Sequence, residues 1–202
     1  MAKCSLACSI ALLSLAVLAP RAGATIIDLD SQTLVPVSVM LGPGMYFIEP
    51  VGPDQGGAYT AWNAWGTVSC ANPDGCLRTC PTSVRGWLNT YVIESPQITG
   101  AWANGMRIDP IPARPPCDLE TALVDMGGVW NFMVNDSHVY PTPEDALAHR
   151  WTSIILLHAA GPVYFTVGDV DTIGNEGGIS LRITSVVSVD ETSFAEIKSL
   201  YR

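Results

Sequence analysis

Basic residues are scarce in this sequence of 202 residues. Ten Lys and Arg are set against nineteen Asp and Glu, and only Lys3 and Lys198 are lysines, so the formal net charge is −9. Nucleic-acid binding requires clustered cations that neutralise phosphates, and this composition does not supply them. We therefore expect no nucleic-acid partner, and a surface that suits cations or neutral ligands.

Long hydrophobic runs are absent except at the N-terminus. Lys3 precedes an apolar run from Leu6 to Ala19, and Ala22-Gly23-Ala24 then provides the small residues that signal peptidase requires. This pattern predicts a signal peptide over residues 1–24, with cleavage after Ala24. No later stretch reaches the roughly 18 apolar residues that a membrane span needs. We expect a secreted protein, extracellular or periplasmic, without a membrane span.

Catalytic motifs are missing as well. The sequence contains no Gly-x-Ser-x-Gly elbow, no His-Glu-x-x-His helix and no phosphate-binding glycine loop. The scattered histidines are best explained as ordinary polar side chains: His138, His149 and His158. Glycoside hydrolysis would need two facing carboxylates, and nothing selects a pair among Asp136, Asp145 and Asp169. We therefore predict that the protein is not an enzyme.

Helical periodicity is nearly absent, and short apolar stretches alternate with Gly, Pro, Asn and Asp about every ten residues. This spacing is typical of an all-β, antiparallel β-sandwich of the jelly-roll type, and we expect residues 25–202 to form one such domain. The predicted strands are Leu34–Leu41, Met45–Glu49, Trp87–Ile93, Gly128–Val134, Thr152–His158, Val163–Val167 and Ile179–Val187.

Turns and a helix complete the predicted fold. Gly42-Pro43-Gly44 is a turn between the first two strands, and Thr152–His158 forms a hairpin with Val163–Val167. Alternation along the last strand directs Ser180 toward water. Pro143–Arg150 is expected to form a short helix capped by Thr142, and the tail from Phe194 to Tyr201 is a second helical candidate.

Four cysteines remain after removal of the signal peptide: Cys70, Cys76, Cys80 and Cys117. An even number in an exported chain predicts two disulfides, although three pairings are open. Zinc binding is the alternative, but the spacing lacks a Cys-x-x-Cys motif and export favours disulfides. We expect a loop-rich, disulfide-linked insert around residues 67–118.

The segment from Gly168 to Gly178 concentrates oxygen donors between two apolar strands. These hard ligands are of the kind that calcium prefers, and they are Asp169, Asp171, Asn175 and Glu176. Gly174, Gly177 and Gly178 allow the backbone to fold back so that carbonyls can join them. An EF-hand is excluded, because the twelfth position from Asp169 is Ser180 and both flanks are strands. The alternative is a solvated β-turn, since Asp, Asn and Gly are common in turns.

The stretch Val163–Ile183 resembles the C-terminal calcium loop of the small calcium-dependent galactose-binding bacterial lectins. The matching positions are Asp169, Thr172, Asn175 and Gly178. The sequence departs from the family at Glu176, where the family has a second Asn, and is one residue shorter between the Asp and the Thr. Upstream, Tyr59 is followed six residues later by Trp65-Gly66, as in the family. The middle of the chain shows no counterpart of the family's sugar-contacting His and Gln.

The resemblance implies a galactose-binding-like sandwich and a calcium ion, with a galactose-like sugar as the ligand. Asp169, Asp171, Asn175 and Glu176 would hold the ion together with the carbonyls of Tyr59 and Thr172. Aromatic rings commonly cover the apolar face of a sugar, and the candidates are Tyr59, Trp62 and Trp65. Trp65 suits the core, whereas Trp62, on the opposite side of an alternating strand, is expected at the surface.

We therefore predict a secreted, non-catalytic carbohydrate-binding protein that uses calcium. The first alternative is a secreted structural or interaction module in which the loop only stabilises one end of the sandwich. The second and weaker alternative is a hydrolase. A neighbouring groove would favour binding over a structural role, and an enzyme would need two carboxylates facing each other across that groove. The sequence leaves the sugar and the oligomeric state open.

Overall fold

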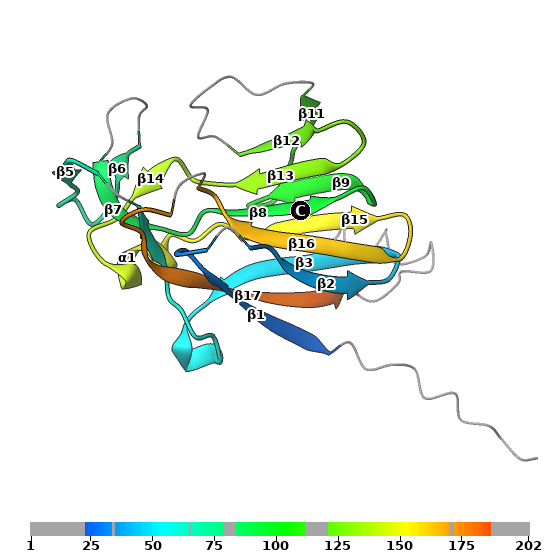
Figure 1. Cartoon of the computed structure of the whole chain (residues 1–202), viewed down its shortest axis with the longest axis horizontal. Coiled ribbons are helices and arrows are strands. Elements are labelled where there is room, and N and C mark those ends of the chain that lie inside the picture. The colour runs from blue at the N-terminus through cyan, green and yellow to red at the C-terminus, as the bar shows by residue number, and fades with distance from the viewer. Residues whose placement is uncertain are drawn as a thin grey trace, which may run out of the picture.

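The computed structural model describes residues 23–33, 35–64, 66–78, 84–111, 121–169 and 172–186. These residues form an all-β sandwich-like fold with two large sheets and one small one, as Figure 1 shows. The only helices of the described chain are the α-helix α1 (Pro143–Ala148) and the 3-10 helix η1 (Pro53–Gln55). The predicted fold class is thus confirmed.

The first sheet has nine strands, and β17 lies at its centre. β1 and β3 both pair with β17 in antiparallel fashion, and β4 pairs with its first two residues. The strands, in order across the sheet, are β10 (Met106–Arg107), β9 (Ile98–Ala103), β15 (Ser153–Leu157), β3 (Gly44–Val51), β17 (Glu176–Val186), β4 (Trp62–Ala64), β7 (Val84–Leu88) and β5 (Val68–Ser69), with β1 (Ala24–Asp30) on β17.

The second sheet has six strands, and a separate pair of strands lies at one end of the molecule. The order of the second sheet is β11 (Pro110–Ile111), β12 (Ala122–Asp125), β13 (Trp130–Val134), β8 (Tyr91–Ser95), β16 (Gly161–Val167) and β2 (Val37–Leu41). The small pair is β14 (His138–Val139) with β6 (Cys76–Leu77). In Figure 1, β5, β6, β7, β14 and α1 gather at the left end.

The hydrophobic core is built from the alternating residues of both large sheets. Ile48, Ile155 and Leu181 come from the first sheet, and Ile93 and Phe165 come from the second; all five are fully buried. Because side chains point to opposite faces at successive positions, β15 and β16 bury every second residue, whereas β8 and β17 also bury consecutive residues where other segments cover their outer face. This alternation is the reason why the strands could be found in the sequence.

The consecutive strands β2 and β3, and likewise β15 and β16, do not pair with each other. β2 pairs with β16, whereas β3 pairs with β15 and β17, so Gly42-Pro43 connects the two large sheets and joins no hairpin. β15 and β16 likewise exist as predicted but belong to different sheets. The predicted turn does lie between two strands, whereas the predicted hairpin of Thr152–His158 with Val163–Val167 is wrong. A turn rich in glycine and proline shows where the chain changes direction, but it does not show which strands pair with each other.

The predicted strand Trp87–Ile93 is in fact two strands. It breaks at Asn89-Thr90 into the end of β7 and the start of β8, which belong to different sheets. Residues 67–118 were expected to be a loop-rich insert, but their described part contains seven strands, β5 to β11, and β8 is interior to the second sheet. The loop-rich prediction is wrong because cysteine spacing says little about the strands between the cysteines.

The predicted exposure of Ser180 is also wrong. Ser180 is fully buried. Its hydroxyl accepts a hydrogen bond from the amide of Tyr59 at 2.9 Å and donates one to Asp28 Oδ1 at 2.5 Å, so it needs no contact with water. The segment after η1 therefore packs over this part of β17. The chain returns to the sheet as β4, so the covering segment is anchored at both ends.

The helix prediction is confirmed for α1. The Thr142 hydroxyl accepts from the amide of Asp145 at 3.1 Å, and Pro143 takes the first helical position. The tail candidate Phe194–Tyr201 and the predicted signal peptide through Ala22 lie outside the described residues, and β1 begins at Ala24. None of the described helices is long and apolar enough to cross a membrane.

Candidate functional site

The structure brings three of the predicted calcium ligands into one turn. Asp169 follows β16, and Asn175 immediately precedes β17. Asn175 Nδ2 donates to Asp169 Oδ2 at 3.2 Å, and the amide of Asn175 donates to the carbonyl of Thr172 at 3.2 Å. Asn175 thus turns its amide nitrogen, and not its oxygen, toward the Asp169 carboxylate, so its side chain would have to rotate for both residues to offer oxygens to one calcium ion. Asp171 lies outside the described residues.

Asn175 also connects this turn to the end of β1. Its side chain is 4% exposed, and Nδ2 donates to the carbonyl of Ser31 at 3.2 Å. Gln32 Nε2 donates to the carbonyl of Asn175 at 3.4 Å, and the Ser31 hydroxyl donates to the carbonyl of Gly177 at 2.9 Å. Asn175 is thus held by segments about 145 residues apart in the chain.

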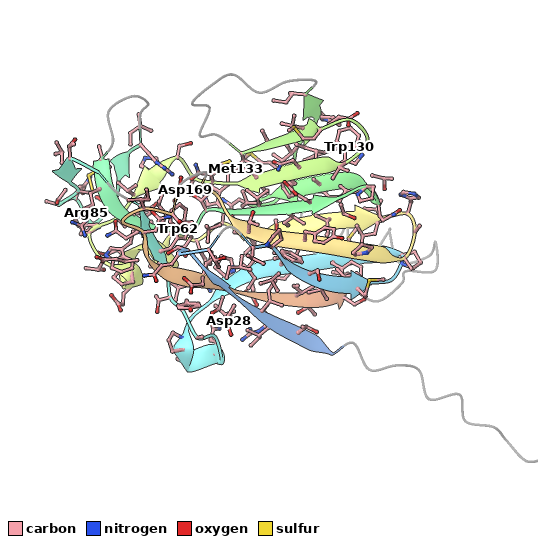
Figure 2. All side chains as sticks on the ribbon, in the orientation of Figure 1. Asp28, Trp62, Arg85, Trp130, Met133 and Asp169 are labelled. Carbon is pink, nitrogen blue, oxygen red and sulfur yellow. A yellow bond between two sulfur atoms is a disulfide. The ribbon has the colours of Figure 1, made fainter. Side chains whose placement is uncertain are left out.

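Glu176 points away from this turn, toward β7. Its carboxylate lies 3.5 Å from Arg85 Nη2, and both side chains are about half exposed. In the sheet, Glu176 is opposite Asn63 of β4. Figure 2 shows Arg85 and Asp169 at the same end of the sandwich. Arg85 therefore competes with any cation for Glu176.

Tyr59 lies beside β17, further along the strand than the turn. Its amide donates to the Ser180 hydroxyl, and its ring packs so closely on Gly178 that a Cβ there would lie 2.6 Å from Tyr59 Cδ2. The described hydrogen bonds of Tyr59 thus join it to β17, and none of them links it to Asp169 or Asn175. Its predicted carbonyl contact with the ion stays a prediction.

Trp62 is a core residue, so the prediction that it is exposed is wrong. Its side chain is fully buried, and Nε1 donates to the carbonyl of Thr90 at 2.9 Å. Strand alternation allows either face to be buried, and here β7 pairs Leu88 beside Trp62 on the core side. A ring in this position does not reach a ligand in solvent. Trp65 lies outside the described residues.

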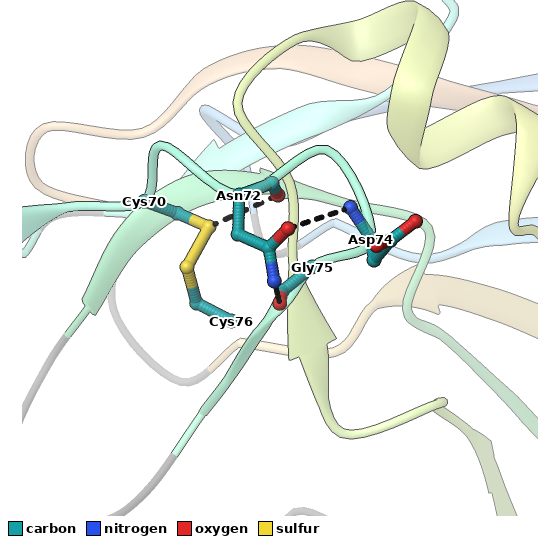
Figure 3. The surroundings of a disulfide bond; sticks show 5 residues. All are labelled: Cys70, Asn72, Asp74, Gly75 and Cys76. Carbon is teal, nitrogen blue, oxygen red and sulfur yellow. Dashed lines mark hydrogen bonds between the residues drawn. A yellow bond between two sulfur atoms is a disulfide. The ribbon is translucent and has the colours of Figure 1, made fainter.

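One disulfide joins Cys70 to Cys76, as Figure 3 shows. The loop that it closes is a turn in which Asn72 Nδ2 donates to the carbonyl of Gly75 at 3.0 Å and the amide of Asp74 donates to Asn72 Oδ1 at 3.1 Å. Disulfide formation is thereby confirmed for this pair. Cys80 and Cys117 lie outside the described residues.

Arg78 follows this disulfide and was missed in the sequence. Its amide donates to the carbonyl of Ser137 at 2.8 Å, which places it beside β14. Its side chain is partly buried, and the buried Nη1 has no hydrogen-bond partner among the residues that the structure describes. Burial lowers the pKa of the Arg78 guanidinium, and the nearby carboxylate of Asp169 acts in the opposite direction. No local motif could have paired Arg78 with a residue 91 positions away.

A cleft of about 220 Å³ lies next to the turn, between β1, the connection to β2, and β16. It reaches Val167, two residues before Asp169, and Asp30, which precedes Ser31. Its lining combines carboxylates and hydroxyls with apolar side chains: Asp28, Asp30, Thr33, Thr166, Val35, Pro36, Val37 and Phe165.

The histidines are engaged in local contacts. Each donates from Nδ1 to a backbone carbonyl, at 2.7 to 2.9 Å: His138 to Asp136, His149 to Asp145, and His158 to Gln97. Among the residues that the structure describes, no group of three or more His, Cys, Asp or Glu is arranged to hold a metal ion. The described donors thus provide two side chains, Asp169 and Asn175, and further calcium ligands would have to come from elsewhere.

Comparisons of the chain with protein-family models, with curated proteins and with solved structures find no match.

Proposed function

We propose that the protein is an exported, non-catalytic carbohydrate-binding protein, with its ligand site at the sandwich end around Asp169. The observation that carries the proposal is the cleft beside the turn, because a turn with only a structural role needs no adjoining cleft. Export is supported by the N-terminal pattern and by the Cys70–Cys76 disulfide, since disulfides persist in oxidising compartments.

The lining of the cleft suits a single sugar ring. Asp30, Thr33 and Thr166 provide acceptors and hydroxyls for the polar edge of a sugar, while Val35 and Val37 offer apolar surface for its ring face. Sites for drug-sized molecules usually measure about 300–1,000 Å³, so a volume of about 220 Å³ suits one ring better than a longer oligosaccharide.

Calcium is the second part of the proposal. Asp169 and Asn175 would contribute oxygen ligands, and the ion would order the turn and bind sugar hydroxyls. The proximity of these two side chains supports this part, although Asn175 now presents its amide nitrogen to Asp169 and would have to rotate to offer its oxygen to the ion. The pairing of Glu176 with Arg85 makes Glu176 the weakest of the predicted ligands.

A glycan array, run with millimolar calcium and with chelator, tests the proposal. The parent protein should bind a galactose-like glycan, and calcium should strengthen the binding. Thr166→Trp would fill the cleft and should abolish binding, whereas Thr99→Trp, on an exposed position of β9, should leave it unchanged. Absence of binding to every glycan, or equal binding by both variants, would contradict the proposal.

A structural or interaction module is the second candidate, and the contacts of Asn175 favour it. Asn175 joins β1 to the turn through buried hydrogen bonds, which would stabilise the sandwich end without any ligand. Under this candidate, Asn175→Ala lowers the melting temperature equally with and without calcium, and no glycan is bound. Under the proposed function, the variant loses the calcium-dependent part as well.

A further inference from the structure

We propose that the outer face of the first sheet is a docking surface for the chain's own C-terminal segment, Phe194–Tyr201, which would pack on it as an amphipathic helix. The described strands provide the apolar surface, and the sequence provides a segment of matching character directly after β17. This inference does not depend on the proposed carbohydrate site.

The outer face of the first sheet carries a group of apolar side chains that point away from the core. Alternate residues of β3, β9 and β15 belong to the core: Tyr46, Ile48, Ala101, Ala103, Ile155 and Leu157. The residues next to them point to the opposite face and are partly exposed: Met45, Phe47, Trp102, Ile154 and Leu156. We name these five residues the apolar patch.

Strand pairing makes the apolar patch continuous across three strands. Ile154 of β15 is opposite Trp102 of β9 on one side and opposite Phe47 of β3 on the other. The Trp102 ring covers Gly100, because a Cβ at Gly100 would lie 2.9 Å from the ring and 3.6 Å from Leu156 Cβ. Contiguous apolar areas on the surface of soluble proteins commonly mark interaction sites.

The outer face of the second sheet carries a polar row at its centre instead. Across β13, β8 and β16, Asn131 is opposite Glu94, and Glu94 is opposite Tyr164. Asn131 Nδ2 donates to Glu94 Oε1 at 2.6 Å. A sheet face that meets water is expected to carry polar residues of this kind. The apolar row of the first sheet therefore indicates that this face is covered.

The apolar patch lies where β17 ends. Val186, the last residue of β17, is opposite Met45 of the patch. Nearer the start of β17 the same face is polar, because Arg182 donates to Glu49 Oε1 and to the carbonyl of Gln55, both at 3.1 Å. The segment of η1 thus lies over the polar half of this face, and the apolar half adjoins the residues that follow Val186.

The sequence after β17 contains an amphipathic pattern that fits this surface. Its apolar residues recur at helical spacing and would share one helix face: Phe194, Ile197, Leu200 and Tyr201. Ser193, followed three residues later by Glu196, has the spacing of a capping box that starts a helix. A helix this short is marginal in water by itself, so burial of its apolar face on the patch would stabilise it.

The connection is long enough to bring this segment onto the patch. Seven residues, 187–193, separate Val186 from Phe194. Fully extended they span about 24 Å, whereas the three strand spacings from β17 to β9 amount to about 14 Å. So short a tether gives the segment an effective concentration in the millimolar range. It should therefore occupy the patch in preference to a second copy of the protein.

The test measures the oxidation of individual methionines by dilute peroxide in the full chain, with peptide mass spectrometry as the readout. Met45 belongs to the patch, whereas Met40 is 72% exposed and Met133 is 5% exposed, so these two report an open and a buried thioether. Met45 should react slowly in the parent and at least fivefold faster in Ile197→Asp, because the new charge cannot pack on the patch. Ser199→Asp, on the opposite face of the helix, should match the parent.

A reciprocal measurement follows the segment itself by trypsin cleavage after Lys198. Ile154→Thr keeps a β-branched residue in β15 but makes the patch less apolar, so cleavage should be at least threefold faster than in the parent. Tyr164→Thr is the matched control, because Tyr164 lies on the outer face of the second sheet. It should leave the cleavage rate unchanged.

Three outcomes would overturn the inference, and none of them depends on glycan binding. The first is equal oxidation of Met45 in Ile197→Asp and the parent, and the second is oxidation of Met45 in the parent as fast as that of Met40. The third is a parent dimer in light scattering whose Met45 becomes reactive on dilution, because a second copy would then cover the patch. If Met133 also reacts faster in Ile197→Asp, that variant has unfolded, and the cleavage rates of Ile154→Thr and Tyr164→Thr decide.

Discussion

The carboxylate of Asp169 has neighbours of two kinds. It accepts a hydrogen bond from the carboxamide nitrogen of Asn175, and the positive charge of Arg78 acts on it. A bound cation would replace the hydrogen bond and would be repelled by the charge of Arg78. Cation binding at this carboxylate therefore depends on both neighbours.

Asp169→Asn should remove the response to calcium. If the ion binds the folded state alone, a hundredfold excess over the dissociation constant stabilises the protein by about 2.7 kcal/mol. For a chain of this size, the melting temperature of the parent should rise by about 5 to 10 °C. The variant should lose most of this shift, because the carboxylate is a principal ligand. Differential scanning calorimetry with calcium and with chelator measures it.

Asp109→Asn is the control for this prediction, because Asp109 is exposed and pairs only with Arg107 at the surface. It should show the same calcium shift as the parent. An identical melting temperature for the parent in calcium and in chelator would contradict the prediction of a metal site, and with it the argument for calcium-mediated sugar binding.

Trp62→Ala should destabilise the fold strongly. Trp62 is fully buried and bonded to the carbonyl of Thr90, so truncation leaves a cavity and an acceptor without its donor. Removal of a buried aromatic ring costs about 3 to 5 kcal/mol. Chemical denaturation should show this loss, whereas Tyr164→Ala, 39% exposed on β16, should cost far less. A loss of glycan affinity without a loss of stability would mean that Trp62 faces the ligand after all.

At the scale of elements, β17 organises the region around the site. It pairs with β1, β3 and β4, and its first residue follows the turn that holds Asn175. Close packing of the covering segment on β17 sets the position of Tyr59. Changes in this strand should therefore affect stability and the site together.

Gly178→Ala tests this close packing. A Cβ at this position would lie 2.3 Å from the carbonyl oxygen of Leu29 and 2.6 Å from the ring of Tyr59, so the backbone or the ring must move. Overpacking of this kind typically costs about 1 to 3 kcal/mol. The matched change Gly42→Ala meets its nearest atom at 3.7 Å and should stay within about 0.5 kcal/mol of the parent. Equal unfolding free energies for the two variants would contradict the packing described.

At the scale of the whole molecule, the predicted removal of the signal peptide makes the net charge more negative. Removal of Lys3 and Arg21 with the predicted signal peptide changes the formal net charge from −9 to −11. A surface of this charge would repel nucleic acids and other polyanions.

Intact mass spectrometry of the exported protein tests processing and oxidation together. The chain should begin at Thr25, and two disulfides should make it four hydrogens lighter than its reduced form. Peptide mapping should recover Cys70 joined to Cys76. Free thiols in the native protein, or retention of residues 1–24, would contradict the prediction of an exported, doubly bridged chain.

The sequence by itself determined the features that depend on neighbours in the chain. The strands β15 and β16 follow from alternation, because burial of every second residue is encoded in adjacent positions. The helix α1 follows from Thr142 and Pro143, which cap and start it locally. The contact of Asp169 with Asn175 was also within reach, since both belong to one short turn.

Only the tertiary structure decided which distant segments meet. It paired β2 with β16, buried Trp62 and turned Glu176 toward Arg85. Period-two alternation shows that one face of a strand is buried, but not which element covers that face. A turn shows where the chain reverses, but not which strand the following segment pairs with. Contacts between residues tens of positions apart depend on how the two sheets pack together, and this packing is set by the whole core rather than by any local pattern.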